Sequence, residues 1–390
     1  MKKNTLFFLL AVIFCFFNPV FGEDFSLLLK DSPLQNRGVW VTAFSKKQVL
    51  YSKEAVIELI DTCKKYNLNE IYIQIYRAGI AYYDSKILDR DQYEKNIKSL
   101  GSDPIDFLIE EASKSNIKVF AWINVLSLSQ NKDAKILKKL GDAILTRDQY
   151  LRPSLKGDSD NETDKYYLRE NQIFIEPADS LVYEYILSII KEITNRYPRL
   201  SGIQLDYIRY PYTVPYSPSS KFGNFGLNYG YGQDSITKFN KTTGLNALSL
   251  KNPDECMIWD DWRRKQVTNL VKAISEYIKN NYPQMSVSCA VISSSERAYT
   301  VVFQDWPSWL ENGLIDYVVL MNYTKDNQMA KQLLASSLCL SGNTKVFNGM
   351  GIFLMGNDSS IIANQLKIIN DLDPAGIVFF SYDDLSVIPI

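Results

Sequence analysis

The stretch NRYPRLSGIQLD, residues 195–206, contains the end of a helix, a short polar turn and a compact apolar strand, in that order. Five other stretches repeat this pattern: KKYNLNEIYIQIY (64–76), SKSNIKVFAWI (113–123), NNYPQMSVSCAV (280–291), ENGLIDYVVLM (311–321) and DLDPAGIVFFSY (371–382). RGVWVTAF (37–44) and TKVFNGMGIF (344–353) add two similar strands. Short apolar runs bounded by turn signals are typical of strands buried on both faces. The sequence therefore predicts eight strands, beginning near residues 38, 70, 117, 201, 285, 315, 345 and 376.

The segments between these strands have the period of amphipathic helices. Apolar residues recur every three or four positions at 56–63, 105–112, 182–193 and 267–278. Asp103 before Pro104 is a helix start, and Gly313 marks a helix end. Strands alternating with helices predict an α/β protein with a parallel sheet, and eight units favour closure into a (β/α)8 TIM barrel. An open doubly wound sheet is the alternative, less favoured because no GxGxxG turn follows the first strand.

Extra length lies in two places, residues 125–170 and 212–255, after the third and fourth strands. Loops that follow the strands build the active site in such barrels. The second insertion is rich in Tyr, Phe, Gly and Pro, so it either packs its own rings together or offers them to sugars. Little chain follows the eighth strand, so we expect the last outer helix to be missing or replaced by residues before the first strand.

The composition excludes several classes of function. The chain has 390 residues with 43 Lys and Arg against 44 Asp and Glu, and this balance argues against nucleic acid or an anionic membrane surface as the main partner. There is no histidine, which excludes Ser-His-Asp and Cys-His catalysis and histidine-ligated zinc. Cys63, Cys256, Cys289 and Cys339 form no CxxC pair, so we expect buried small apolar residues rather than disulfides or metal ligands.

Residues 1–22 have the layout of a secretory signal peptide: two lysines, about a dozen apolar residues, and Gly22 at the expected cleavage site. The apolar stretch is short for a membrane span. Phe14 is bulky where lipid attachment at Cys15 would require a small residue, which favours simple export. We therefore expect a protein exported to the periplasm or outside the cell, with residues 23–390 forming a single domain and no membrane span after cleavage.

Polar residues gather where the predicted strands end, as a barrel active site requires, and they should be absent from the strand starts. Asp206 is the strongest catalytic candidate, and a structural ion pair with Arg209 or Arg77 is the less favoured alternative. Glu296, after the fifth strand, is the second catalytic candidate, with a plain surface glutamate as the alternative. The candidates for substrate binding are Trp40, Gln74, Arg77, Trp122, Asn124, Tyr207, Arg209, Asn322, Tyr323, Tyr382 and Asp383, the last of which could be a simple turn residue. Carboxylates accompanied by aromatic rings and amides fit glycosidic bond cleavage, in which one carboxyl group protonates the leaving oxygen and another acts as nucleophile or activates water.

Five motifs, in order, resemble the glycoside hydrolase-like family 10 proteins, which are exported bacterial barrels grouped with glycosidases. They are RGVWVT (37–42), DPIDFLIEEASKSNIKVFAWIN (103–124), GIQLDYIRYP (202–211), DDWRRKQVTNLV (260–271) and GLIDYVVLMNYT (313–324). The resemblance runs from about Arg37 to the C-terminus and implies a barrel that hydrolyses a cell-wall or extracellular polysaccharide. It assigns Asp206 the place of a strand-four nucleophile and puts Glu296 near that of a strand-five acid. The sequence reads AWINVLSLS where the family often has WxNPYR, which changes the expected pocket.

Three functional hypotheses follow. The leading one is a secreted glycoside hydrolase that needs no cofactor, with Asp206 as nucleophile or base, Glu296 as acid, and Arg77 and Arg209 holding Asp206 ionised. The second is a carbohydrate-binding protein without turnover. The third is an enzyme with carboxylate-bound Mg²⁺ or Ca²⁺, because oxygen ligands suffice for these cations. Glu176, in the IFIEP segment, is either a supporting group or a further catalytic candidate.

Overall fold

The computed structural model describes residues 29, 32–155, 172–213, 226–356 and 358–385. The expected signal peptide at 1–22, with Cys15, lies outside these residues, as do parts of both expected insertions. None of the helices in the described ranges combines the length and the apolar character that crossing a bilayer requires.

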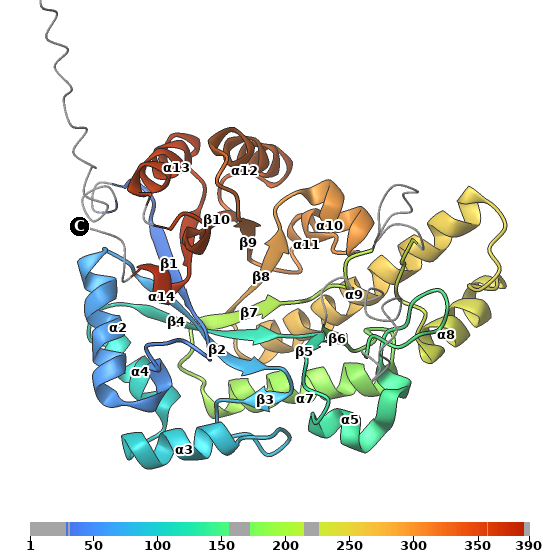
Figure 1. Ribbon diagram of the computed structural model, residues 1–390, viewed down its shortest axis with the longest axis horizontal. Coiled ribbons are helices and arrows are strands. Elements are labelled where there is room, and N and C mark those ends of the chain that lie inside the picture. Colours follow the sequence, from blue (N-terminus) through green and yellow to red (C-terminus); the bar gives the residue numbers. More distant parts are fainter. Residues whose placement is uncertain (1–28, 30–31, 156–171, 214–225, 357, 386–390) are drawn as a thin grey trace, which may run out of the picture.

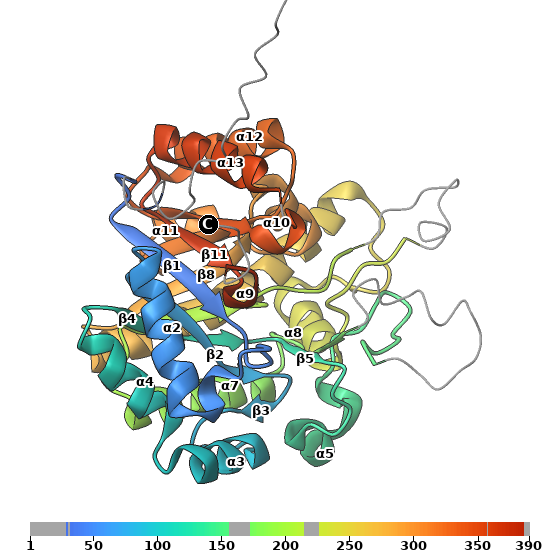
Figure 2. The same cartoon turned by 60° about the vertical axis from the view of Figure 1, so that its left-hand side comes forward.

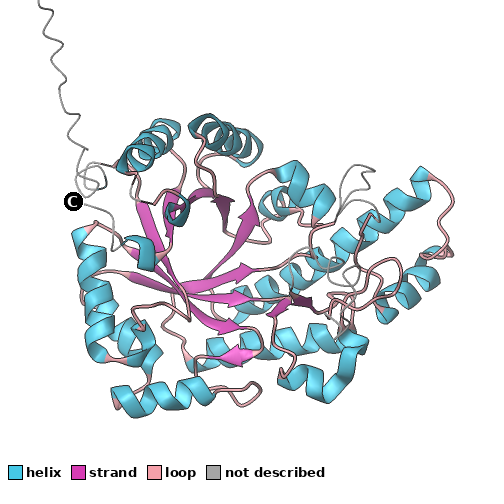
Figure 3. Cartoon of the chain, viewed as in Figure 1, coloured by secondary structure: helices cyan, strands magenta, loops and turns pink. Residues whose placement is uncertain are grey.

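Eight parallel strands form a closed barrel (Figures 1 and 3). Going round it, each strand pairs with the next in the order β1, β2, β4, β7, β8, β9, β10, β11, and β11 pairs again with β1. This confirms the predicted TIM barrel and excludes the open sheet. The strands are β1 (Asn36–Val41), β2 (Glu70–Arg77), β4 (Lys118–Asn124), β7 (Gly202–Asp206), β8 (Ser286–Ile292), β9 (Tyr317–Asn322), β10 (Val346–Gly351) and β11 (Gly376–Phe380).

Helices surround the strands (Figure 2). The main ones are α2 (Lys53–Lys65), α4 (Pro104–Ser113), α7 (Ser180–Arg196), α9 (Pro253–Asn281), α11 (Trp306–Glu311), α12 (Asn327–Ser341) and α13 (Ser359–Leu372). The predicted start of α4 is confirmed, since the Asp103 carboxylate accepts hydrogen bonds from the amides of Ile105 and Asp106. After β11 the described chain adds only α14 (Tyr382–Leu385), one turn long, as expected for a barrel without its last full outer helix.

Extra segments follow three of the strands. After β4 come β5 (Ser127–Ser129), α5 (Lys135–Leu140), η2 (Gly141–Ile144) and β6 (Ile173–Phe174), and after β7 comes α8 (Gln233–Thr243). The sequence did not predict a third such segment, after β2, with β3 (Ile80–Ala81) and α3 (Asp91–Leu100). The remaining short helices are η1 (Val49–Tyr51), α10 (Ser295–Val301) and η3 (Ile352–Leu354).

The core of the barrel has two layers. A large outer cluster fills the space between strands and helices, and a smaller inner cluster inside the barrel includes Trp40, Tyr72, Trp122 and Phe347. The strands approach each other very closely at Gly202, where a Cβ would overlap the Ser286 carbonyl oxygen of β8 and lie 2.6 Å from its Oγ. The expectation that the cysteines are buried is correct for Cys63 and Cys289 but wrong for Cys256 and Cys339, which are exposed.

One strand start carries a buried carboxylate, contrary to the expectation that such groups are absent there. Glu70 opens β2, and its Oε2 accepts a hydrogen bond of 2.8 Å from the Tyr72 hydroxyl. Burial raises the pKa of Glu70, and the hydrogen bond from Tyr72 opposes that shift. The Tyr72 hydroxyl also contacts that of Tyr317 at 2.9 Å. Because the amino ends of barrel strands serve stability, we interpret Glu70 as structural.

Candidate active site

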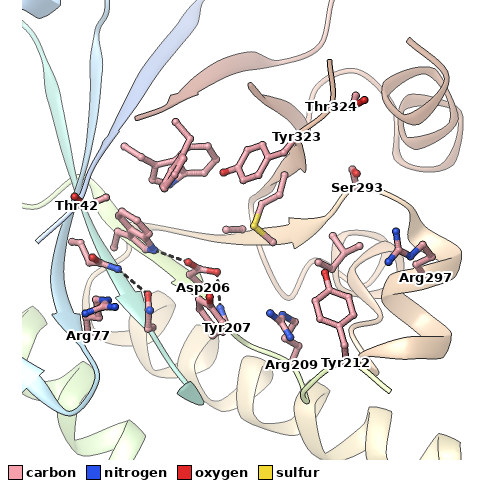
Figure 4. Close-up of a pocket in the computed structure, with 18 of the residues that line it drawn as sticks. Thr42, Arg77, Asp206, Tyr207, Arg209, Tyr212, Ser293, Arg297, Tyr323 and Thr324 are labelled. Atoms are coloured by element: carbon pink, nitrogen blue, oxygen red, sulfur yellow. Dashed lines mark hydrogen bonds between the residues drawn. The ribbon is translucent and has the colours of Figure 1, made fainter. Parts of the chain in front are cut away.

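A pocket of about 550 Å³ opens at the carboxyl ends of the strands (Figure 4). This volume is within the roughly 300–1,000 Å³ usual for ligand sites. Nine of the thirteen predicted site residues line it: Trp40, Gln74, Arg77, Trp122, Asn124, Asp206, Tyr207, Arg209 and Tyr323. The barrel therefore brings together residues that are up to 283 positions apart in the sequence.

Asp206 is the last residue of β7, and its side chain faces the pocket with only 7% of the residue exposed. The Trp122 indole Nε1–H donates to Asp206 Oδ2 at 3.0 Å, and the Tyr207 amide donates to Oδ1 at 2.7 Å. Hydrogen bonds to an ionised acceptor are stronger than neutral ones, so both donors stabilise a negative charge on this carboxylate.

Tyr207 adopts a left-handed backbone conformation with φ of 50°, which is uncommon for a residue other than glycine. This conformation ends the alternation of the strand, so Asp206 and Tyr207 both line the pocket although they are neighbours in sequence. The Tyr207 hydroxyl accepts a hydrogen bond of 3.0 Å from Gln172 Nε2, which ties the ring to the segment before β6. Strain of this kind is often found at functional sites.

Polar side chains around Asp206 are fixed by contacts between strands. Gln74 Nε2 donates to Asn124 Oδ1 at 3.0 Å, and Gln74 Oε1 accepts from the Ala43 amide at 3.2 Å. The Trp40 indole donates to Gln204 Oε1 inside the barrel. Each of these side chains is buried, so the wall of the pocket is largely set before any ligand arrives.

Tyr323 lines the opposite part of the pocket, after β9. Burial raises the pKa of its hydroxyl well above the usual value, and the negative charge of Asp206 raises it further. The hydroxyl therefore stays protonated. It can donate a hydrogen bond to a substrate oxygen but cannot act as a base near neutral pH.

Arg77 and Arg209 were predicted to hold Asp206 ionised. Arg77 instead donates to Ser129 Oγ at 3.3 Å and places its guanidinium carbon 4.8 Å from the centre of the Phe44 ring. Arg209 donates to the Tyr210 carbonyl at 3.0 Å and lies over the rings of Tyr207 and Tyr212. Among the contacts described for Asp206, the hydrogen bonds from the Trp122 indole and the Tyr207 amide favour its charge, and support from Arg209 stays a prediction.

Glu296 is not among the residues that line the pocket, contrary to its predicted catalytic role. It is the second residue of α10 and is exposed, whereas its neighbour Arg297 lines the pocket. The reason is geometric, because successive helical residues are about 100° apart and cannot face the same side.

Asn322, Tyr382 and Asp383 also lie outside the pocket lining. Asn322 Nδ2 donates to the Ala330 carbonyl and to Asn348 Oδ1, so it points from β9 toward α12. Tyr382 is buried in the outer core layer. Asp383 accepts hydrogen bonds from the Ser45 hydroxyl and the Lys46 amide, and these fix α14 to the loop after β1.

The pocket includes residues that were not predicted: Thr42, Phe44, Tyr212, Ala290, Ile292, Ser293, Arg297, Met321, Thr324, Met329, Leu333 and Phe380. The period of two along each strand could have identified several of them. Thr42 follows Trp40 by two positions, and Met321 precedes Tyr323 by two. The same rule places Asn322 on the other face of β9.

Glu176 is buried outside the pocket, and we interpret it as a supporting group. Its Oε1 accepts a hydrogen bond of 2.5 Å from Tyr210, the residue that follows Arg209. Burial raises the pKa of Glu176, and the Tyr210 hydroxyl opposes this shift. A Cβ on Gly232 would lie 2.7 Å from Glu176 Cγ, so the segment before α8 packs directly on this contact.

Within the described ranges, no group of three or more His, Cys, Asp or Glu side chains is arranged to hold a metal ion. The residues that line the pocket include a single carboxylate in the described part of the chain, that of Asp206.

The model of the family described as glycosyl hydrolase-like 10 matches residues 35–358. The chain belongs to this family. The matched region contains seven of the eight barrel strands, and only β11 lies beyond it. It also contains Asp206 and the other pocket residues from Trp40 to Leu333.

Two curated relatives are named as glycosyl hydrolases. DigH of Escherichia coli K12 is 24% identical over 361 residues, covering 83% of this chain and 75% of the relative. YngK of Bacillus subtilis is 24% identical over 312 residues, covering 74% of this chain and 54% of the relative.

Solved glycosidase structures share the fold. The catalytic domain of a β-amylase from Paenibacillus polymyxa matches with a TM-score of 0.56 at 11% identity, over 91% of this chain and 95% of that one. A β-galactosidase from Bacillus circulans matches with a TM-score of 0.58 at 12% identity, over 91% of this chain and 51% of that one. At these identities the likeness concerns the barrel architecture.

Proposed function

We propose that this member of the glycosyl hydrolase-like 10 family is a glycoside hydrolase acting on a polysaccharide or oligosaccharide, with Asp206 as its essential carboxylate. The observation that carries the proposal is the environment of Asp206. Its carboxylate lies in a concave pocket at the carboxyl end of the barrel and accepts two hydrogen bonds that favour its charge. The names of the relatives support this reaction class.

The ionised carboxylate can act in either of two ways. It can attack the anomeric carbon as a nucleophile, or it can remove a proton from a water that attacks this carbon; in both cases the bond to the glycosidic oxygen breaks and that oxygen takes up a proton from water. The exposed ring of Phe44 offers an apolar face for a sugar, and the buried indoles of Trp40 and Trp122 line the same pocket. The amide of Asn124 and the Tyr323 hydroxyl can hydrogen-bond sugar hydroxyls.

The test is release of reducing ends from a panel of cell-wall and extracellular glycans by the purified chain, with Asp206→Asn in parallel. We expect release from at least one glycan by the wild type and none above background by the variant. No release from any glycan in the panel would contradict the proposal.

Carbohydrate binding without turnover is the second candidate function. It is favoured by a specific observation: the described pocket lining has one carboxylate, whereas the usual glycosidase mechanisms use two. Under this alternative, titration calorimetry detects glycan binding by the wild type while no reducing ends appear on prolonged incubation. Turnover that depends on Asp206 would exclude it.

The indole donor of Trp122 provides a more selective test of the hydrolase. Trp122→Phe keeps an aromatic ring but removes the Nε1–H that reaches Asp206 Oδ2. A hydrogen bond to a charged group contributes about 1.5–3 kcal/mol, so we expect kcat/KM to fall by about 10- to 100-fold. Trp309→Phe is the control, since its indole donates to Thr268 Oγ1 at 2.9 Å outside the pocket. Equal losses in the two variants would argue against a role for Trp122 at the site.

We also propose that the protein is exported, on the basis of residues 1–22. Expression of the full chain in a bacterial host should yield mature protein in the periplasm or medium, with an N-terminus at Glu23. Recovery of uncleaved protein beginning at Met1 would contradict this.

A further inference from the structure

Three arginines line the candidate active site. Arg77, Arg209 and Arg297, here called the pocket arginines, all line it, and Asp206 is the one carboxylate among the described lining residues. Arg77 and Arg297 alone outnumber that carboxylate among the described lining residues. A site that binds only neutral sugars needs hydrogen-bond donors and apolar faces but no such excess of charge.

Arg77 and Arg297 have no described ion pair, unlike most other arginines in the described part of the chain. Seven arginines in the described part of the chain form ion pairs with carboxylates: Arg90, Arg147, Arg152, Arg196, Arg199, Arg263 and Arg264. Arg77 has a serine hydroxyl and the Phe44 ring as its described contacts. Arg297 is exposed, and no ion pair is described for it within the same ranges. Both guanidinium groups are thus available for an anion from outside.

The positions of these two arginines relate them to the proposed reaction centre. Arg77 ends β2 and Arg297 lies in α10 after β8, while the strand of Asp206 lies between β4 and β8 in the barrel order. At the carboxyl end of the barrel the neighbouring strands follow the order β2, β4, β7, β8. Arg77 and Arg297 therefore lie on opposite sides of Asp206. Figure 4 shows this order, with Arg209 and Tyr212 between Asp206 and Arg297.

We propose that the pocket binds a glycan with carboxylate groups, built from sugar acid units, and that Arg77 and Arg297 each hold one carboxylate, on opposite sides of the bond at Asp206. The planar guanidinium fork matches a carboxylate with two parallel hydrogen bonds. Phe44, 61% exposed and stacked with Arg77, adds an apolar face for the sugar ring beside one of these groups. This inference rests on the proposed carbohydrate function of the same pocket and specifies its substrate class.

The experiment compares each acidic oligosaccharide with its own methyl ester, which keeps the backbone but removes the charge. Titration calorimetry would use oligogalacturonate, oligomannuronate and oligoglucuronate with the full chain. We expect the free acid of at least one to bind about tenfold or more tightly than its ester, with a difference that shrinks at high salt because the ions screen the charges.

Arg77→Gln and Arg297→Gln then test the two anion sites. Each variant should bind the preferred acid about tenfold more weakly and its ester with unchanged affinity. Arg199→Gln is the matched control, since this arginine is 57% exposed, pairs with Asp106 and lies outside the pocket lining. Equal affinity for acid and ester across the panel, or variants that weaken acid and ester alike, would overturn the inference.

The outcome can be separated from that of the hydrolase proposal, because binding is measured with Asp206→Asn as well as with the wild type. A preference for acids without any cleavage would support the anion sites and contradict hydrolysis. Cleavage of neutral glycans without a preference for acidic ones would support hydrolysis and contradict the anion sites.

Discussion

Replacing Asp206 by asparagine is expected to reduce glycan cleavage by at least about 10³-fold, because general acid–base catalysis alone contributes roughly 10²–10⁴-fold and a nucleophilic role adds to it. Asparagine has nearly the same shape but can neither attack the anomeric carbon nor accept a proton from water. One of its two terminal atoms is also an N–H donor. That atom would face either the Trp122 indole or the Tyr207 amide, both of which are donors themselves.

Glu296→Gln is the matched control for this variant, since it makes the same carboxylate-to-amide change at an exposed residue outside the pocket. Initial rates should be unchanged, and calorimetry should show that Asp206→Asn still binds the glycan. A large loss in Glu296→Gln together with an active Asp206→Asn would refute our placement of the reaction centre.

Gly202→Ala is expected to lower the free energy of unfolding by about 3 kcal/mol, as inserting atoms into a packed core does. The added Cβ would overlap the Ser286 carbonyl oxygen, and this atom belongs to the backbone of a barrel strand. A flexible side chain could move aside, but here β7 and β8 must separate. Urea unfolding followed by circular dichroism measures the loss.

Gly244→Ala separates crowding from backbone conformation. Gly244 has φ of 73°, and its Cβ would enter open space after α8. An alanine there should lower the free energy of unfolding only by the cost of the left-handed conformation, about 1 kcal/mol. If Gly202→Ala loses no more stability than Gly244→Ala, the close approach of the two strands is not the cause. Because Gly202 is four residues before Asp206, we also expect Gly202→Ala to lose activity before it unfolds.

The barrel could be predicted from the sequence because strand and helix periods are local and repeat eight times. All eight predicted strand starts fall within two residues of the observed ones, as at Gly202 and Gly376. The extra segment after β2 was not predicted, because β3 is only two residues long and α3 is mostly polar, with Tyr93, Ile97 and Leu100 as the only apolar side chains among its ten residues.

The site was harder to predict, because the end of a strand indicates where a residue lies but not which way its side chain points. Asn322 and Tyr323 are adjacent, so regular alternation allows only one of them into the pocket. Asp206 and Tyr207 are adjacent too, yet both line it, because φ of Tyr207 is positive. Whether Glu296 or Arg297 faces the pocket depends on where α10 begins, and helix boundaries are uncertain by one or two residues in sequence.

The hydrogen bonds to Asp206 have a consequence for how this barrel can change over evolution. Both donors belong to the barrel itself, one in β4 and one directly after β7, so the groups that stabilise the carboxylate are oriented before substrate binds and need no reorganisation. Phe44 and Arg297 come from segments after the strands, where replacements are tolerated more easily. The carboxylate that we propose to react and the groups that we propose to select the glycan are therefore physically separable, so we expect changes at the rim to alter the preferred glycan and leave the chemistry intact.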